Sequence, residues 1–133
     1  MKFKSIQERN YKLDDLLVST DWLDGNIENK NLVILDLDSK DEYLESHIPG
    51  SINVLDNYYK TSLEDRTHVQ DITQIKNTFS KLGINSDSIV VGYDRSACLY
   101  SFRLAWVLHY YGHKNVKVLD GGFPKWVYEK KSV

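Results

Sequence analysis

The residues from 93 to 103, YDRSACLYSFR, contain the only cysteine of the chain, Cys98, and a carboxylate at Asp94. The apolar run before them predicts a buried strand, and the spacing of apolar residues after them predicts a helix. A loop between a strand and a helix start can bind an anion or hold a nucleophile, because the first N–H groups of a helix have no partners within it. The first loop position, where the strand would deliver a nucleophile, is Asp94. The stretch therefore indicates either an active site or a site without its nucleophile.

Asp94 and Cys98 differ in the chemistry that they offer at this loop. The Asp94 carboxylate can accept hydrogen bonds from loop N–H groups, as a helix-capping side chain does. Cys98 lies four residues farther on, where we expect the chain to have turned into the helix. We therefore predict a structural Asp94 and a Cys98 that packs as a small hydrophobic residue. A nucleophilic Cys98 stays open as an alternative.

Length and composition exclude several classes of function. A chain of 133 residues with 41% apolar and 27% charged residues fits one compact domain. A net charge of −2 and the absence of a long basic run argue against nucleic acid or a membrane as partner. The sequence has no apolar stretch of ~20 residues, no signal peptide, and one cysteine that cannot form an internal disulfide, so we expect a cytoplasmic protein. No ligand cluster has the spacing of a metal site, and we expect no cofactor.

The elements that would position the loop alternate between strands and helices. Four Val- and Ile-rich runs predict strands, at 32–37, 51–54, 88–93 and 116–120. Capping boxes predict two helix starts, at Ser39 with Glu42 and at Asp71 with Gln74, and Gly83 ends the second helix.

Two further helices are predicted in the second half of the chain. One runs from 99 to 111, and we expect its face of Leu99, Phe102, Trp106 and Tyr110 to pack on the sheet. The other starts near Pro124. Strands that are apolar on both faces and alternate with helices indicate the α/β class with a parallel sheet. Functional residues of such sheets lie beyond the carboxyl ends of the strands, here after Leu37, Val54 and Tyr93.

The order of four stretches resembles the rhodanese family of sulfurtransferases. They are LVSTDWL (17–23), VILDLDSKDEYLESHIPGSINV (33–54), VVGYDRSACLYSFRLAWVLHYYGHKNV (90–116) and VLDGGFPKW (118–126). The resemblance implies a rhodanese-like α/β fold over residues 17–133, with a mainly parallel central sheet of about five strands and helices on both faces. Residues 1–16 would then be an N-terminal extension.

The resemblance also implies a function in sulfur transfer, but the loop of this chain departs from the catalytic pattern. In catalytic members a cysteine follows the strand directly and carries sulfur as a persulfide, whereas here Asp94 follows Tyr93. This is similar to the non-catalytic amino-terminal domain of two-domain thiosulfate or 3-mercaptopyruvate sulfurtransferases. The implied partners are a second rhodanese domain of the same chain and a small sulfur donor. The degenerate loop consists of Asp94, Arg95, Ser96, Ala97, Cys98 and Leu99, and we expect Arg95 and Ser96 to face solvent.

His47, in HIPGSINV, lies at the end of the predicted helix that begins after Ser39, just before the turn into the strand at 51–54. We expect it to hold the turn by hydrogen bonds. By resemblance, an equivalent histidine of some mercaptopyruvate enzymes is backed by an aspartate and assists a serine of the other domain, and Asp36 and Asp38 are the carboxylates nearby. The family often has arginine where this chain has Asp38, which removes a positive charge.

Three other functions remain open at this point. The chain can be a stand-alone regulatory module that binds an anion or a protein, or a weak sulfurtransferase that uses Cys98. Phosphatase activity is the least favoured, because only four residues separate Cys98 from Arg103 and phosphatases of this fold have five.

Overall fold

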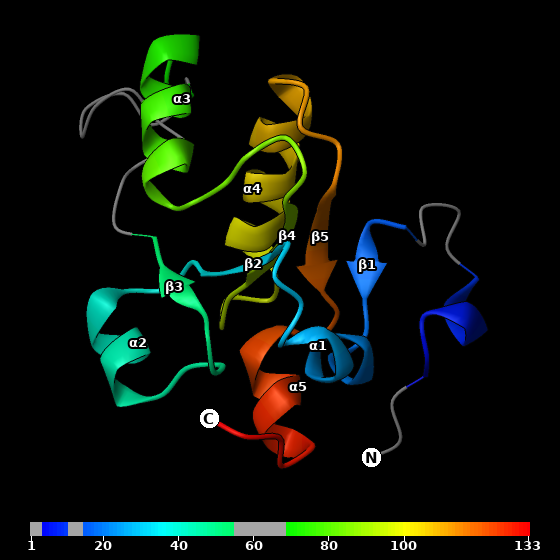
Figure 1. The fold of residues 1–133 in the computed structure, drawn as a ribbon. Helices are drawn as coiled ribbons and strands as arrows, with labels where there is room; N and C mark the ends of the chain where they lie inside the picture. Colours follow the sequence, from blue (N-terminus) through cyan, green and yellow to red (C-terminus); the bar gives the residue numbers. More distant parts are fainter. Residues whose placement is uncertain (1–3, 11–14, 55–68) are drawn as a thin grey trace.

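Five strands form one parallel sheet at the centre of the molecule (Figure 1). The structure is a computed structural model, and it describes residues 4–10, 15–54 and 69–133. The strands follow the order β1-β5-β4-β2-β3, and each pair of neighbours is parallel. Their bounds are β1 (Leu17–Val18), β2 (Leu32–Asp36), β3 (Ile52–Asn53), β4 (Ile89–Tyr93) and β5 (Val116–Leu119). The predicted α/β class and the parallel sheet of about five strands are confirmed.

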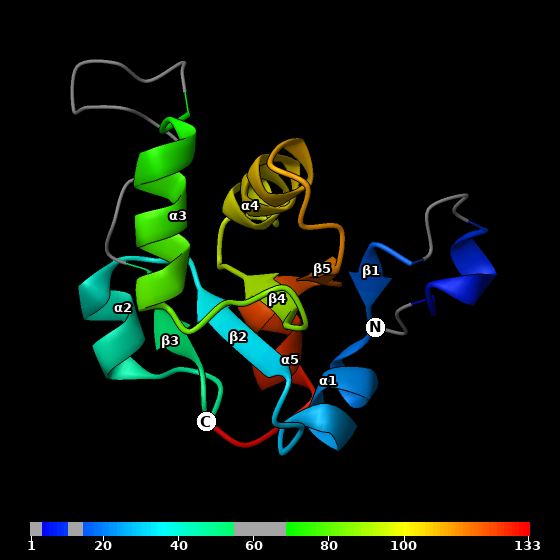
Figure 2. The ribbon, with the colours of Figure 1, turned by 45° about the horizontal axis from the view of Figure 1, so that its top comes forward.

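Helices cover both faces of the sheet, as predicted. Figure 2 shows α3 and α4 on one side of it and α1 and α5 on the other. The bounds are α1 (Thr20–Asn26), α2 (Lys40–Glu45), α3 (Ile72–Lys81), α4 (Leu99–Tyr110) and α5 (Gly122–Tyr128), with a short 3-10 helix, η1 (Gln7–Arg9). Because neighbouring strand residues point to opposite faces, Leu35 and Val90 pack with α3 and α4, whereas Ile34 and Val91 pack with α1 and α5.

Local signals place most helix ends. Both predicted capping boxes are present, Ser39 with Glu42 at α2 and Asp71 with Gln74 at α3. Gly83 follows α3 with a φ of +79°, a conformation that favours glycine. The prediction did not include β1 or α1. Ser19 caps α1 by accepting a hydrogen bond from the Trp22 N–H, without the acidic partner that would have completed a capping box.

The face of α4 that packs on the sheet is not the predicted one. Leu99, Phe102, Trp106 and Tyr110 are 65%, 46%, 51% and 65% exposed, so the prediction that they pack on the sheet is wrong. The buried residues are Ser101, Leu104, Ala105, Val107 and Leu108. The cause lies at the helix start, where the buried Ser101 is hydrogen-bonded to Asp94 and turns its own side of α4 inward. Residues three, four and seven positions later then face the sheet.

The carboxyl ends of the strands gather three acidic positions at one edge of the sheet. Asp36 ends β2 and pairs in register with Tyr93, the last residue of β4, so that Asp36 lies beside the start of the Asp94 loop. Asp120 follows β5, which is the other neighbour of β4. This is the edge at which the sequence predicted the functional residues.

Candidate functional site

Asp94 fills the loop between β4 and α4 with its own side chain. The side chain is fully buried, and each carboxylate oxygen accepts two hydrogen bonds. Oδ1 accepts from the N–H groups of Ser96 and Cys98, at 2.8 and 2.9 Å. Oδ2 accepts from the N–H and the hydroxyl of Ser101, at 2.8 and 2.6 Å. The expected hydrogen bonds from the loop to Asp94 are present, and the donors that could bind an external anion here are turned onto this carboxylate.

The loop backbone is unusual beside Asp94. Ala97 and Cys98 have φ angles of +55° and +65°, a left-handed conformation that is rare for residues with a side chain. Cys98 is the residue before α4, so the prediction that the chain has already turned into the helix at this position is wrong. Its N–H donates to Asp94, and its thiol donates to the carbonyl oxygen of Leu119 at 3.5 Å. The sulfur thus lies against the end of β5.

The surroundings of Cys98 favour its thiol over its thiolate. Burial raises the pKa of Cys98 to about 11, and the negative charges of Asp94 and Asp120 act in the same direction. Nucleophilic cysteines have the opposite environment, with cations or N–H donors that lower the pKa. Cys98 is thus packed against the end of β5 in surroundings that favour its thiol, and its low reactivity stays a prediction.

Alkylation of Cys98 is expected to be slow at neutral pH and to increase up to a midpoint near pH 11. At pH 8 the folded chain should react on the order of 100-fold more slowly with iodoacetamide than the urea-unfolded chain, because its thiolate fraction is smaller. Since the pKa is raised in the folded state, stability from the buried thiol is complete below the unfolded pKa and is lost as pH increases through the folded pKa. Mass spectrometry of timed samples measures the rate, and a folded-state midpoint below pH 8.5 would contradict this reading.

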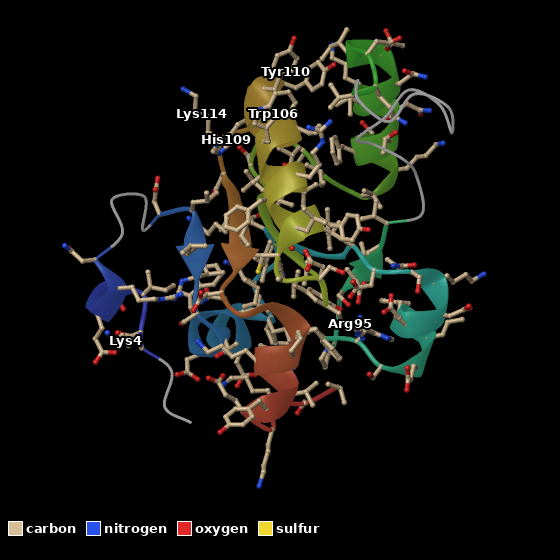
Figure 3. All side chains as sticks on the ribbon, turned by 180° about the vertical axis from the view of Figure 1, so that it is seen from behind. Lys4, Arg95, Trp106, His109, Tyr110 and Lys114 are labelled. Carbon is tan, nitrogen blue, oxygen red and sulfur yellow. The ribbon has the colours of Figure 1, made fainter. Side chains whose placement is uncertain are left out.

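Arg95 is held inside the site and does not face solvent, contrary to the prediction. Its side chain is 19% exposed and forms an ion pair with Asp38, whose carboxylate also accepts the Arg95 N–H at 3.0 Å. The guanidinium donates to the Ser46 carbonyl at 2.6 Å and lies 3.9 Å from the centre of the Phe123 ring. Figure 3 shows Arg95 beside α2. Sequence spacing gave no signal for this pairing, because 57 residues separate Asp38 from Arg95. Ser96 is exposed, as predicted.

Asp36 and Asp38 are both directed to Arg95. Asp36 is fully buried; its Oδ1 accepts the Asp38 N–H at 2.9 Å, and its Oδ2 lies 3.7 Å from the Arg95 guanidinium. Burial raises the pKa of Asp38, and the hydrogen bonds and positive charge of Arg95 oppose that increase. Asp38 is therefore the counter-ion of Arg95, and the positive charge of this site lies on that loop residue.

His47 lies in the turn from α2 to β3. Its Nδ1 is 2.7 Å from the Tyr43 carbonyl oxygen, and its ring stacks on the Tyr43 ring at 3.9 Å between centroids. This is the turn-holding contact that the sequence predicted. The structure does not bring Asp36 or Asp38 to His47 among the hydrogen bonds of the described residues. The catalytic support role that the resemblance implied for these three residues stays a prediction.

Sequence reasoning missed two residues that complete the site. Ser101 gives two of the four hydrogen bonds on Asp94, and its position inside a helix pattern gave no sign of this. Gly122 has a φ of +58°, and a Cβ atom there would lie 2.4 Å from the Asp94 carbonyl oxygen. The Phe123 N–H donates to that oxygen at 3.1 Å. The start of α5 is therefore packed directly on the loop, which the GG pair could have indicated.

Neither a metal cluster nor a membrane span is found in the part of the chain that the structure describes. Residues 4–10, 15–54 and 69–133 contain no group of three or more His, Cys, Asp or Glu side chains placed to hold a metal ion. No helix among these residues has the length and apolar character needed to cross a bilayer.

Comparisons with a family model and with curated sequences agree on one family. Residues 19–129 match the family described as Rhodanese-like domain. A relative from Mycolicibacterium smegmatis named "Putative thiosulfate sulfurtransferase" is 36% identical over 115 residues, which cover 84% of this chain and 40% of the relative. One of the same name from Saccharopolyspora erythraea is 36% identical over 118 residues, which cover 85% and 40%. The chain spans about two-fifths of the length of these curated relatives.

Solved structures give the same fold. SseA from Escherichia coli, described with the rhodanese fold and catalytic mechanism of 3-mercaptopyruvate sulfotransferases, is 25% identical with a TM-score of 0.71. The match covers 86% of this chain and 48% of that one. The human single-domain sulfurtransferase TSTD1 is 17% identical with a TM-score of 0.64, covering 88% and 98%, and this likeness shows the fold alone.

Proposed function

This chain belongs to the family of rhodanese-like domains, and we propose that it is the non-catalytic N-terminal half of a longer cytoplasmic sulfurtransferase. The sulfur donor is thiosulfate or 3-mercaptopyruvate, and a thiophilic acceptor receives the sulfur. The names of the relatives support thiosulfate, and the likeness to SseA supports 3-mercaptopyruvate. The single cysteine, which cannot form an internal disulfide, supports the cytoplasmic location.

The observation that carries the proposal is the state of Asp94 at the nucleophile position. Sulfur transfer in this family needs a thiolate that attacks the transferable sulfur of the donor and keeps it as a persulfide. The bond from that sulfur to the rest of the donor breaks, so that thiosulfate releases sulfite and 3-mercaptopyruvate releases pyruvate. A carboxylate cannot form that bond. The four hydrogen bonds on Asp94 also occupy the N–H donors that would stabilise a thiolate or an anionic persulfide. Catalysis is therefore assigned to another part of the longer protein.

Cys98 does not replace the missing nucleophile in this proposal. Its thiol is directed to the Leu119 carbonyl, and the carboxylates of Asp94 and Asp120 both disfavour its thiolate. A persulfide at Cys98 would place another negative charge beside the same two groups, and this costs free energy in a half-buried site.

The partner that we propose is a second rhodanese domain of the same protein, docked on the aromatic stripe of α4. This stripe consists of Leu99, Phe102, Trp106 and Tyr110, and all of them are exposed. Trp106 and Tyr110 stack at 5.3 Å, and Figure 3 shows both on the outer part of α4. Aromatic residues are enriched in protein interfaces, and three of these four exposed side chains are aromatic. The relatives are longer by about three-fifths of their own length, and that additional length could contain the domain that covers this stripe.

Thiosulfate:cyanide sulfur transfer tests the proposal. We expect this chain alone to produce no thiocyanate above the buffer rate, and the longer natural protein to produce it. The Cys98→Ser variant should leave the activity of the longer protein unchanged within about twofold, because Cys98 takes no part in the transfer. Hydroxyl-radical footprinting gives a second readout, in which Trp106 and Tyr110 should be oxidised less in the longer protein than in this chain.

Two results would overturn the proposal. Transfer by this chain alone that Cys98→Ser abolishes would make Cys98 the nucleophile. A natural protein no longer than this chain, inactive in the same assay, would favour the stand-alone binding module.

A further inference from the structure

The stretch from Arg95 to Leu119 is a cationic part of a chain whose net charge is negative. The whole sequence has a net charge of −2, but this stretch contains no Asp or Glu. Beyond Arg95 its arginine and lysine residues are Arg103 on α4, Lys114 in the turn after α4 and Lys117 on β5. The charge of the chain is therefore distributed unevenly, and α4 with the turn that follows it is on the positive side.

A pocket lies beside the aromatic stripe of α4. Its volume is about 610 Å³, which is enough for several side chains of a partner, and its described lining includes His109, Lys114 and Lys117. Figure 3 shows Trp106, His109, Tyr110 and Lys114 together at one end of α4. The pocket therefore continues the aromatic stripe, and a partner that covers the stripe also reaches the pocket.

The contacts in the pocket distinguish its two lysines. Lys117 Nζ donates to the backbone carbonyl of Asp15 at 2.7 Å, and Asp15 is the one carboxylate residue of the described lining. Lys114 is exposed, and its side chain forms no ion pair with the residues that the structure describes. The backbone of Lys114 is held, because its carbonyl oxygen lies 3.2 Å from Nε2 of His109. Lys114 is therefore the cation of this pocket that is most accessible to a carboxylate from outside.

Positive charge is also present on the stripe itself. The Arg103 guanidinium lies 5.1 Å from the centre of the Trp106 ring, which stacks on Tyr110. A partner that covers these rings is thus placed between Arg103 and Lys114. Like charges brought together at an interface are repelled, so the charges on this surface favour a partner that has carboxylates at these positions.

We propose that the second domain, when it docks on the aromatic stripe, places an Asp or Glu side chain in this pocket against Lys114. The inference rests on the proposed function, which supplies the domain that covers the stripe. The apolar side chains of the stripe give the contact area. The ion pair sets the orientation of the second domain, because complementary charges contribute to specificity more than to affinity.

Acetylation of lysine side chains in the longer natural protein and in this chain tests whether Lys114 is covered. An N-hydroxysuccinimide ester of acetic acid is the reagent, and mass spectrometry gives the rate at each lysine. Lys114 should react about two- to fivefold more slowly in the longer protein, because an ion pair of up to about 1 kcal/mol keeps its amine protonated. The matched control is Lys40, exposed at the start of α2 and at the carboxyl edge of the sheet, whose rate should be the same in both proteins.

Carbodiimide crosslinking tests the chemistry of the group that faces Lys114. The reagent joins an amine and a carboxylate that are in contact through an amide bond, and it takes up the water that is lost. We expect an amide between Lys114 and an Asp or Glu of the second domain, and none at Lys40. Products that also form in this chain alone, for example between Lys114 and Asp15, come from within this domain and are set aside. The yield should fall in about 1 M NaCl, where the Debye length is about 3 Å.

Three results would overturn the proposal. The first is an equal acetylation rate of Lys114 in the longer protein and in this chain. The second is crosslinking of Lys114 to another copy of this domain, which would make a second copy the occupant. The third is binding of a single-stranded oligonucleotide that Lys114→Glu abolishes, which would assign the surface to nucleic acid.

These readouts separate this proposal from the proposed function. If Trp106 and Tyr110 are protected in an active longer protein but Lys114 is not, the proposed function stands and the ion pair is excluded. If the crosslink forms in a longer protein that transfers no sulfur, the docking stands and the proposed sulfur transfer is excluded.

Discussion

Replacing Asp94 by alanine is expected to lower the free energy of unfolding by about 3 kcal/mol or more. The substitution removes the acceptor of four hydrogen bonds, and three of the donors are backbone N–H groups. A buried donor without a partner costs about 1–3 kcal/mol, and the entry of water into the space limits the total. The Ser101 hydroxyl and N–H, which are fully buried, should contribute most. Urea unfolding followed by tryptophan fluorescence and circular dichroism measures the change.

Asp87→Ala is the matched control for this experiment. Asp87 is an exposed aspartate in the turn before β4, and its substitution should change stability by less than about 0.5 kcal/mol. Asp94→Asn keeps the size of the side chain but replaces an acceptor oxygen by a donor, so its effect should lie between those of Asp87→Ala and Asp94→Ala. A loss below about 1 kcal/mol for Asp94→Ala would show that the loop does not depend on this carboxylate.

Gly122→Ala is expected to have the second large effect, a loss of about 2–4 kcal/mol in the free energy of unfolding. The new Cβ atom would lie 2.4 Å from the Asp94 carbonyl oxygen, so the backbone of the loop or of α5 must move. The φ of +58° adds the strain of a left-handed conformation, about 1–2 kcal/mol. Movement would also break the hydrogen bond from the Phe123 N–H to the same oxygen. Thermal and urea unfolding measure the loss.

Gly25→Ala provides a control of opposite sign. Gly25 lies inside α1, and a Cβ atom there meets nothing within 4 Å. Alanine should stabilise this helix by about 0.5–1 kcal/mol, because it restricts the unfolded chain without a clash. If both glycine substitutions changed stability by the same amount, the close contact at Gly122 would not be the cause.

The sequence predicts those parts of the fold that depend on local signals. The capping residues Ser39 and Asp71 act within one helical turn, so their helix starts follow from three-residue spacing. The apolar runs of β2, β4 and β5 need only burial on both faces to be recognised as parallel strands. The functional edge then follows from strand polarity, and Asp94 lies where that argument places it.

The remaining features depend on contacts between distant residues. The rotation of α4 is set by the Asp94–Ser101 hydrogen bonds, whereas the sequence offers an aromatic and an aliphatic face of similar apolar character. Arg95 has the composition of a surface loop residue, and only the approach of Asp38 from another strand end makes it part of the interior. The spacing of apolar residues describes one helix or strand at a time, so it cannot predict either effect.

The two left-handed residues of the loop also bear on what a cysteine at position 94 could do. Ala97 and Cys98 hold a costly backbone shape without glycine, and the Asp94 carboxylate binds the N–H of Cys98 within it. Exchanging Asp94 for cysteine would remove the anchor of that shape together with the oxygen atoms, so the amides would no longer converge on the new sulfur. We therefore expect Asp94→Cys alone to give no sulfur transfer, because further positions of the loop would have to change with it.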